Sequence, residues 1–242
     1  MTPAEVKRRE WEQRHMTDKE FVSLIGDLSE KECLEKTEIS LYGNETLTAI
    51  PPEIKRFKNL KILGVQGNSI VYSKVAKELG ELIHIETIYF ASSLLGNSLI
   101  QIPPPLFNLI NLTDITLSKC KLKYVSPEIG KLVNLHRLTL DENYISTLPS
   151  EMIRLTSLAE LYLSDNKLPK QFMKTVNGQE NVQTFLTKIH KYYSSREEKV
   201  KSIIVKYMTI LKKVLHKDIV PLVAKRLWAT RQNKSWLKVL KK

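Results

Sequence analysis

The sequence predicts an α/β solenoid, which is a stack of similar coils that each combine a short strand with a helical return limb. Three observations lead to this fold class. The segments that begin at Leu112, Leu135 and Leu158 repeat one apolar pattern at intervals of 23 residues. More degenerate copies of this pattern precede them, and helical patterns of a different kind occupy both ends of the chain. A fixed period of about 20 to 50 residues is typical of repeat proteins, in which each unit packs only on its neighbours.

Each repeat is predicted to begin with a short strand. In the segment L-x-x-L-x-L the apolar residues alternate, so that two of them face the core while the residues between them face outward. Three residues later Cys120, Asn143 or Asn166 supplies a side chain that can bond the turn backbone of adjacent coils. The return limb then places Ile or Met, and a Leu three residues further on, along one inward helical side. One such coil cannot bury its apolar side alone, but a stack can.

Degenerate copies extend the pattern toward the N-terminus, so that we expect about six repeats over residues 36–169. These copies begin near Lys36, at Leu60 and at Ile85. The Leu60 copy lacks the Leu-Pro of the return limb and has Ser-Ile-Val-Tyr-Ser at residues 69–73 instead. The Ile85 copy carries an insertion around residues 93–96, which we expect to project from the turn after its strand.

This pattern resembles the intracellular, 23-residue class of leucine-rich repeats, whose return limb has the form L-P-x-x-I-x-x-L, as in Ras-suppressor-like and Scribble-like scaffolds. The resemblance covers roughly residues 36–169. It implies a horseshoe with a parallel sheet on its concave side, and a concave face that binds other proteins.

The residues that we expect on the concave face follow from the alternation within each strand. The predicted partner-binding residues are Tyr42, Gln66, Tyr89, Asp114, Arg137, Asp141, Glu160 and Tyr162. Tyrosine offers a large, rigid contact area with a polar end, and it is enriched among residues that dominate binding energy. The alternative is that these residues are merely tolerated on a polar sheet face. The leading hypothesis centres the contact on Tyr89, Arg137 and Tyr162.

Residues 1–35 are predicted to form a helical cap over the first coil, because the end of a solenoid must be covered. Thr2 and Thr17 each stand three residues before a Glu, which is the arrangement of a capping box at a helix start. The apolar residues that give the second helix one core-facing side are Phe21, Val22, Leu24, Ile25 and Leu28.

Residues 170–242 are predicted to form a basic helical region. Apolar residues recur at helical spacing from Val182 to Tyr193, and we expect them to cover the last coil. Residues 195–198 form a further capping box, which predicts that a new helix begins there with a continuous apolar side. Asp218 is predicted to cap another helix that continues to Trp228.

Positive charge is concentrated in this last region. The chain has a formal net charge of +12, and residues 170–242 hold 18 Lys and Arg against 4 Asp and Glu, which leaves 20 against 22 elsewhere. Such a field attracts acidic surfaces, which are nucleic acid, anionic lipid or an acidic protein partner. The residues expected to make these contacts are Lys201, Lys206, Lys212, Lys213, Arg226 and Arg231. A helical bundle whose lysines only solvate its outer face is the alternative.

Two further resemblances concern the segment at residues 217–228. It resembles the opening helices of F-box-like modules, although their leading Leu-Pro is absent, and this implies a ubiquitin-ligase adaptor whose repeats select the substrate. The segment is also similar to terminal segments in proteins of large DNA viruses.

No sequence motif predicts catalysis, and we expect no cofactor and no bound metal. The eight glycines are scattered singly, so no Gly-rich phosphate loop is present, and the five histidines lack the spacing of a zinc site. His136 lies on the sheet side, where it is expected to be an ordinary surface residue. Asp141, Glu142 and Asp165 are predicted to be solvated turn charges. The chain is therefore predicted to be a non-enzymatic scaffold.

The sequence predicts an intracellular location. The two cysteines, Cys33 and Cys120, lie far apart and suggest no disulfide framework, which fits a reducing compartment. The first ten residues mix charges of both signs without an apolar run, and no apolar stretch approaches the ~20 residues of a membrane-spanning helix. The cytoplasm is the expected site, with the nucleus or a viral particle as alternatives.

Overall fold

The computed structural model describes residues 17–41, 46–91 and 99–214. The chain divides into two compact units, residues 1–191 and residues 192–242. All strands of the sheet and all the coils that carry them belong to the first unit.

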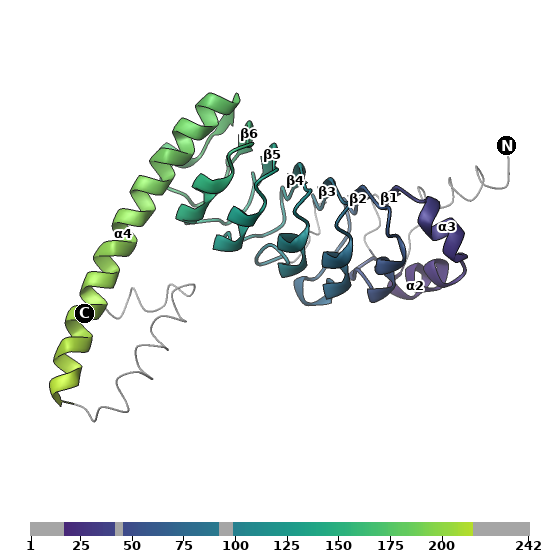
Figure 1. Ribbon diagram of the computed structural model, residues 1–242, viewed down its shortest axis with the longest axis horizontal. Helices are drawn as coiled ribbons and strands as arrows, with labels where there is room; N and C mark the ends of the chain where they lie inside the picture. The colour runs from purple at the N-terminus through teal and green to yellow at the C-terminus, as the bar shows by residue number, and fades with distance from the viewer. Residues whose placement is uncertain (1–16, 42–45, 92–98, 215–242) are drawn as a thin grey trace. The chain divides into compact units, whose positions relative to one another are not determined.

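One sheet of seven strands follows the order of the chain. The strands are β1 (Glu38–Ser40), β2 (Ile62–Gly64), β3 (Thr87–Tyr89), β4 (Asp114–Thr116), β5 (Arg137–Thr139), β6 (Glu160–Tyr162) and β7 (Thr175–Asn177). β1 to β6 pair in parallel and lie side by side (Figure 1). The middle residue of each is buried and apolar, as the alternation predicts, so the first and third residues belong to the outward face.

The return limbs are short 3-10 helices on the side of the coils opposite the strands (Figure 1). They are η1 (Pro52–Arg56), η2 (Tyr72–Lys74), η3 (Lys77–Glu81), η4 (Pro104–Asn108), η5 (Pro127–Lys131), η6 (Ser150–Arg154) and η7 (Lys170–Phe172). Helical turns of three to five residues favour i→i+3 hydrogen bonds, and a first-turn proline loses no bond there. The inward residues predicted for these limbs, such as Ile129 and Met152, are fully buried.

The coil that lacks Leu-Pro contains two such helices, η2 and η3. Its backbone pairs with the preceding coil instead, through a bridge between Ile50 and Val75 and a hydrogen bond from the Val71 amide to the Thr48 carbonyl. Adjacent 3-10 helices also approach closely at Gly80 and Gly130. A Cβ atom at Gly130 would lie 2.8 Å from the Glu151 carbonyl oxygen, so this contact requires glycine.

Two short helices, α2 (Asp18–Gly26) and α3 (Glu30–Glu35), cover the first coil. The capping box of Thr17 and Glu20 is confirmed, and the structure adds an unpredicted one between Ser29 and Glu32. Val22 does not face the core as predicted. It is 36% exposed, because Phe21, Ile25 and Leu28 alone fill the inward side. The box predicted at Thr2 lies outside the described residues.

Polar side chains fasten this cap to the coils. Asp18 accepts hydrogen bonds from the amides of Thr48 and Ala49, at 2.7 and 2.9 Å, and from the Thr48 hydroxyl at 2.5 Å. Arg56 donates to the carbonyl oxygens of Ile25, in the last turn of α2, and of Leu28, just after this helix.

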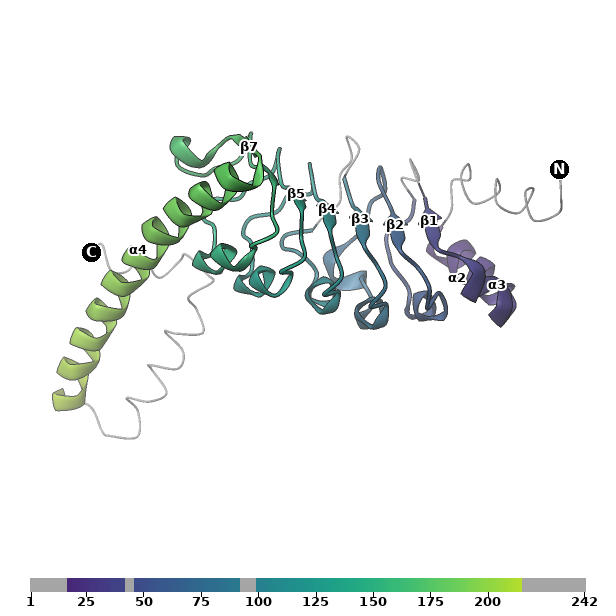
Figure 2. The same ribbon diagram turned by 45° about the horizontal axis from the view of Figure 1, so that its top comes forward.

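The C-terminal end of the sheet departs from the predicted helix. Residues after Pro169 first form η7 and then β7, which pairs antiparallel with β6 (Figure 2). α4 (Gln179–Val214) follows, and its residues Val182, Leu186 and Ile189 are fully buried, as predicted. Their burial is that of a cap on the last coil.

The helix start predicted at residues 195–198 is wrong. α4 continues through these residues as one helix of 36 residues. The amides of residues 195–198 therefore lie in the interior of a helix, where carbonyls four residues earlier are available, and no free helix end remains for Ser195 to cap.

Several predictions fall outside the described residues. They are the insertion at residues 93–96, the helix from Asp218 to Trp228, and the F-box-like segment at residues 217–228. Within the described part of the chain, α4 and the shorter helices are too polar or too short to cross a membrane.

Candidate functional site

The outward face of β3 to β6 is the candidate site, and the strand register arranges it in rows. The first residues of β4, β5 and β6, which are Asp114, Arg137 and Glu160, stand opposite one another and form a charged row. The third residues form a second row, which consists of Tyr89, Thr116, Thr139 and Tyr162. Neighbouring strands lie about 4.8 Å apart, so each row is a closely spaced line of side chains.

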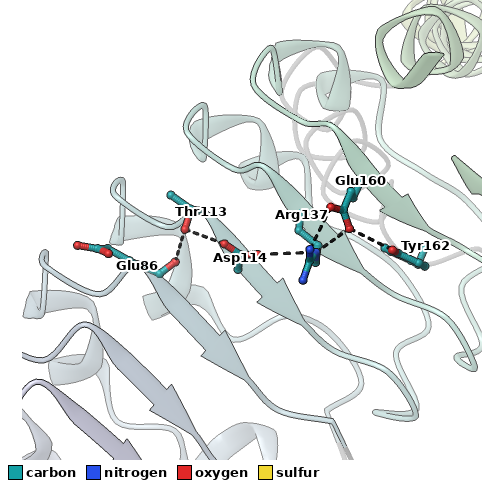
Figure 3. Close-up of polar contacts among 6 residues, drawn as sticks. All are labelled: Glu86, Thr113, Asp114, Arg137, Glu160 and Tyr162. Carbon is teal, nitrogen blue, oxygen red and sulfur yellow. Dashed lines mark hydrogen bonds and ion pairs between the residues drawn. The ribbon is translucent and has the colours of Figure 1, made fainter. Parts of the chain in front are cut away.

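Arg137 joins the two carboxylates of the charged row (Figure 3). Its Nε and Nη2 atoms donate to Glu160 Oε2 at 2.7 Å and Oε1 at 3.0 Å, which is a bidentate pair. Arg137 Nε also lies 3.8 Å from Asp114 Oδ1. The Tyr162 hydroxyl donates to Glu160 Oε2 at 3.0 Å, so the pair is braced from the second row.

These contacts shift the pKa values of the three groups that share them. The hydrogen bond from Arg137 lowers the pKa of Glu160, with a smaller contribution from the Tyr162 hydroxyl. The same bonds raise the pKa of Arg137 and that of Tyr162, because each proton donor is stabilised by the carboxylate. Glu160 therefore stays ionised and Tyr162 stays protonated at neutral pH.

The predicted binding residues are only partly brought together. The charged row and the two tyrosines Tyr89 and Tyr162 share one face, but Gln66 lies on the coil of β2, apart from them, and is half-buried. Asp141 follows β5 and accepts a hydrogen bond from the Ser118 hydroxyl at 2.8 Å. Tyr42 lies outside the described residues.

Two of the turn carboxylates that were predicted to be solvated also have protein partners. Asp141 holds Ser118 of the preceding coil, and Glu142 forms an ion pair with Lys119 at 3.2 Å. Glu142 and Asp165 share a positive φ of 53°, at the same position of successive coils. These residues therefore shape the turn that follows each strand.

Thr113 and Glu86 belong to the polar network of this face but were not among the predicted residues. The Thr113 hydroxyl lies 2.8 Å from Asp114 Oδ2 and 3.1 Å from the Glu86 carbonyl oxygen, and Lys61 pairs with the Glu86 carboxylate at 3.0 Å. These residues precede the first outward position of their strands, as His136 does. A row of polar residues at this repeat position was the available signal.

Buried asparagines support the site from behind, as predicted. Asn143 Oδ1 accepts from the amides of Cys120 and Leu122, and its Nδ2 donates to carbonyls that include those of Leu117 and Leu140. Asn166 repeats part of this arrangement one coil later. The thiol of Cys120 lies 3.2 Å from the Phe90 carbonyl oxygen, so it stands in the place of an asparagine amide.

A second ladder of asparagines was not predicted. Asn59, Asn111 and Asn134 each stand directly before the first apolar residue of a repeat. Asn111 and Asn134 donate to carbonyl oxygens of the preceding coil, and Asn59 donates to the Leu34 carbonyl oxygen of α3. Gln183 of α4 takes the role that an asparagine of a further coil would have, because its side-chain amide donates to the Leu155 carbonyl oxygen at 2.8 Å. The recurring Asn-Leu dipeptide was the signal in the sequence.

The described residues contain no group of three or more His, Cys, Asp or Glu that could hold a metal ion. Cys33 and Cys120 are both buried free thiols, and burial raises the pKa of Cys33. Of the predicted basic contacts, Lys201 and Lys206 are exposed on α4, and Lys212 and Lys213 lie further along the same helix. Arg226 and Arg231 lie outside the described residues.

Fold and site together define a repeat solenoid with an outward-facing polar sheet. The family model described as leucine rich repeat matches residues 110–168. The matched segment lies within a solenoid of the leucine-rich-repeat fold, and its coils extend on both sides of that segment.

Two solved structures are similar to this chain over about half of its length. A leucine-rich-repeat protein of Leptospira interrogans is 29% identical over 57% of this chain and 34% of its own, with a TM-score of 0.52. The plant peptide hormone receptor RGFR1, in complex with RGF2, is 31% identical over 54% of this chain and 20% of its own, with a TM-score of 0.46. This chain thus spans about a third or less of either structure. No curated protein sequence matches it.

Proposed function

We propose that this chain is a non-enzymatic interaction module that binds a protein partner on the outward face of β3 to β6. The observation that carries the proposal is the alignment of Tyr89 and Tyr162 in one row beside the charged row of Asp114, Arg137 and Glu160. Leucine-rich-repeat folds typically serve as protein interaction modules and are generally non-enzymatic.

The chemistry of the face supports a protein ligand. Thr116 and Thr139 are small, and they separate the two tyrosines by two intervening strands, which leaves a shallow polar strip between aromatic ends. Tyrosines concentrate binding energy at protein interfaces, and the bidentate pair of Arg137 and Glu160 holds neighbouring side chains in fixed positions. The two buried free thiols support an intracellular, cytoplasmic location for the module.

The test is capture of partners from an extract of the source organism with the full chain, followed by affinity measurement with the captured protein. Replacing Tyr89, Arg137 and Tyr162 together by Ala is expected to weaken binding by more than about tenfold, because each of the two truncated tyrosine anchors costs on the order of 1–2 kcal/mol. Tyr144→Ala is the matched control, since this tyrosine is exposed on a turn outside the sheet face.

A chain that ends at Lys191 separates this proposal from one in which the basic region binds first. This end point keeps β7 and the buried residues Val182, Phe185, Leu186 and Ile189 of α4, which an end at Pro169 would remove. A partner retained by the shortened chain after a high-salt wash supports the sheet face. Binding that survives the triple substitution but is lost on shortening would refute it.

The second candidate function gives the primary role to the basic region. Residues 192–242 hold 14 Lys and Arg against 3 Asp and Glu, and the described Lys199, Lys201 and Lys206 are exposed. A nucleic acid or another anionic assembly is the ligand class that this charge favours. A ubiquitin-ligase adaptor remains a third proposal, and it requires that a ligase subunit copurify with the full chain.

A further inference from the structure

The charge of the sheet face is opposite to that of the chain as a whole. At the described outward positions, which are the first and third residues of each strand and the residue two positions beyond it, the charged residues are Glu38, Asp114, Arg137, Asp141 and Glu160. Lys119 and Glu142, in the turns beyond these positions, pair with each other. Four carboxylates thus face one guanidinium, although the chain carries a net charge of +12. A local field of this sign attracts cations and repels phosphate.

The one cation on this face is already engaged. Arg137 makes its bidentate contact with Glu160, and its Nε lies 3.8 Å from Asp114. The described hydrogen bonds to the carboxylates of Asp141 and Glu38 come from the neutral hydroxyls of Ser118 and Ser40. An ionised carboxylate offers about four acceptor sites, so these groups keep capacity for further donors.

We propose that the partner segment held by this face is a basic one, an extended stretch of protein that carries arginine or lysine. This deepens the function proposed above and rests on it. Asp114 and Glu160 are two strands apart, or about 10 Å. This matches side chains three residues apart on a polyproline II segment, which lie on one side because that helix has three residues per turn and rises about 3.1 Å per residue. Tyr89 and Tyr162 flank the strip between them and offer ring faces on which a guanidinium can stack.

Arg137 limits the affinity for such a segment. It neutralises part of the acidic row and would repel an incoming cation, so its removal strengthens binding of a basic ligand. This sign is opposite to that expected if Arg137 were itself the anchor for an acidic partner. The two possibilities are therefore separated by one substitution.

The experiment measures binding of a fluorescein-labelled peptide of Arg-Pro-Pro repeats, which favour the polyproline II conformation, to the full chain by fluorescence anisotropy. Asp114→Asn combined with Asp141→Asn is expected to weaken binding about fivefold to tenfold, the scale of losing two exposed charge pairs. The matched control is Glu81→Gln combined with Glu128→Gln, which changes net charge equally on the 3-10 helices η3 and η5. Arg137→Gln is expected to tighten binding about twofold to fivefold.

The proposal is overturned if Asp114→Asn combined with Asp141→Asn weakens peptide binding no more than the control pair does. It is also overturned if the Arg137→Gln variant binds the peptide more weakly than the natural chain does. The gain expected for Arg137→Gln cannot arise from a folding defect. Failure here is distinguishable from failure of the proposed function. If the captured partner is lost on substitution of Tyr89 and Tyr162 but retained by the Asp114 and Asp141 pair, the sheet face binds protein by other chemistry.

Discussion

Single buried side chains connect the coils, and Asn143 shows the principle most clearly. Its amide group satisfies two backbone amides of one coil and carbonyls of two coils. Its place in the repeat was legible in the sequence, because Asn recurs at this position. The Cys120 thiol, in contrast, has no oxygen with which to accept amide hydrogens, so residue type alone does not reveal how its coil satisfies them.

Replacing Asn143 by Leu is expected to lower the free energy of unfolding by about 3 kcal/mol or more, since each buried polar group left without a partner costs about 1–3 kcal/mol. Urea denaturation followed by circular dichroism measures the change. Asn134→Leu is the control in the same coil. Asn134 is exposed and donates one bond, to the Ile110 carbonyl, so the expected loss is about 1 kcal/mol. Equal losses would show that Asn143 does not link the coils as described.

Asp18 makes the N-terminal cap sensitive to acid. Burial alone would raise the pKa of Asp18, but hydrogen bonds from Thr48 and Ala49 and the nearby Lys74 ammonium outweigh it and lower the pKa below the ordinary value of 3.8. A carboxyl whose folded pKa is depressed stabilises the fold above its unfolded pKa, and loses that contribution as the pH falls through the folded pKa.

The stability difference between the natural chain and Asp18→Asn should therefore be constant near neutral pH and shrink as the pH falls below 3.8. Thermal denaturation of both proteins over a pH series tests this. Asp27→Asn is the comparison, because no hydrogen bond to the carboxylate of Asp27 is described and Asp27 is exposed. A difference that grows toward acid pH would contradict the assignment.

At the scale of elements, regular alternation was predictable and the exceptions were not. The six parallel strands follow from L-x-x-L-x-L, and the inward sides of the return limbs follow from apolar residues at spacing three. β7 was not predicted, because Val176 is the single apolar residue among its three and because it pairs antiparallel with β6 instead of continuing the parallel order. The capping box at residues 195–198 led to a wrong prediction of a helix start, because the same residue types are also compatible with the interior of a helix.

The first turns of α4 are expected to hold the last coil in place. Leu186→Ala removes a fully buried side chain and should cost about 2–5 kcal/mol. Hydrogen exchange would show the effect at the amides of β6 and β7, and α4 should lose protection with them. Lys188→Ala changes an exposed residue of the same turn and is expected to leave exchange unchanged. Faster exchange confined to β1 and β2 would contradict a capping role.

At the scale of the whole molecule, positive charge is concentrated in the second of the two units. Residues 192–242 carry 14 of the 38 Lys and Arg and 3 of the 26 Asp and Glu, which leaves 24 against 23 in residues 1–191. The coils are thus close to neutral overall, with an acidic sheet face. The face depends on register, which places Asp114, Arg137 and Glu160 in one row, and register was not available from composition.

The basic region is expected to bind polyanions in a manner that depends on salt. Retention of the full chain on heparin should fall steeply with ionic strength, while a chain that ends at Lys191 should elute at low salt, because each phosphate or sulfate contact releases counterions. Column elution under a salt gradient measures both. A shortened chain that is retained as strongly as the full one would place the anion-binding surface on the coils instead.

The antiparallel β7 has a consequence for how arrays of this kind change in length. A parallel coil can be followed by another of the same kind, but a strand that runs the other way presents a different pattern of donors and acceptors, and α4 then occupies the position of the next coil. Both ends are therefore unique, while the coils that begin at Leu112 and Leu135 are interchangeable units of 23 residues. Duplication of one of these interior coils would widen the sheet face by one strand per copy. Duplication that includes β7 would instead place an antiparallel strand inside the array and disrupt the cap that β7 and α4 form.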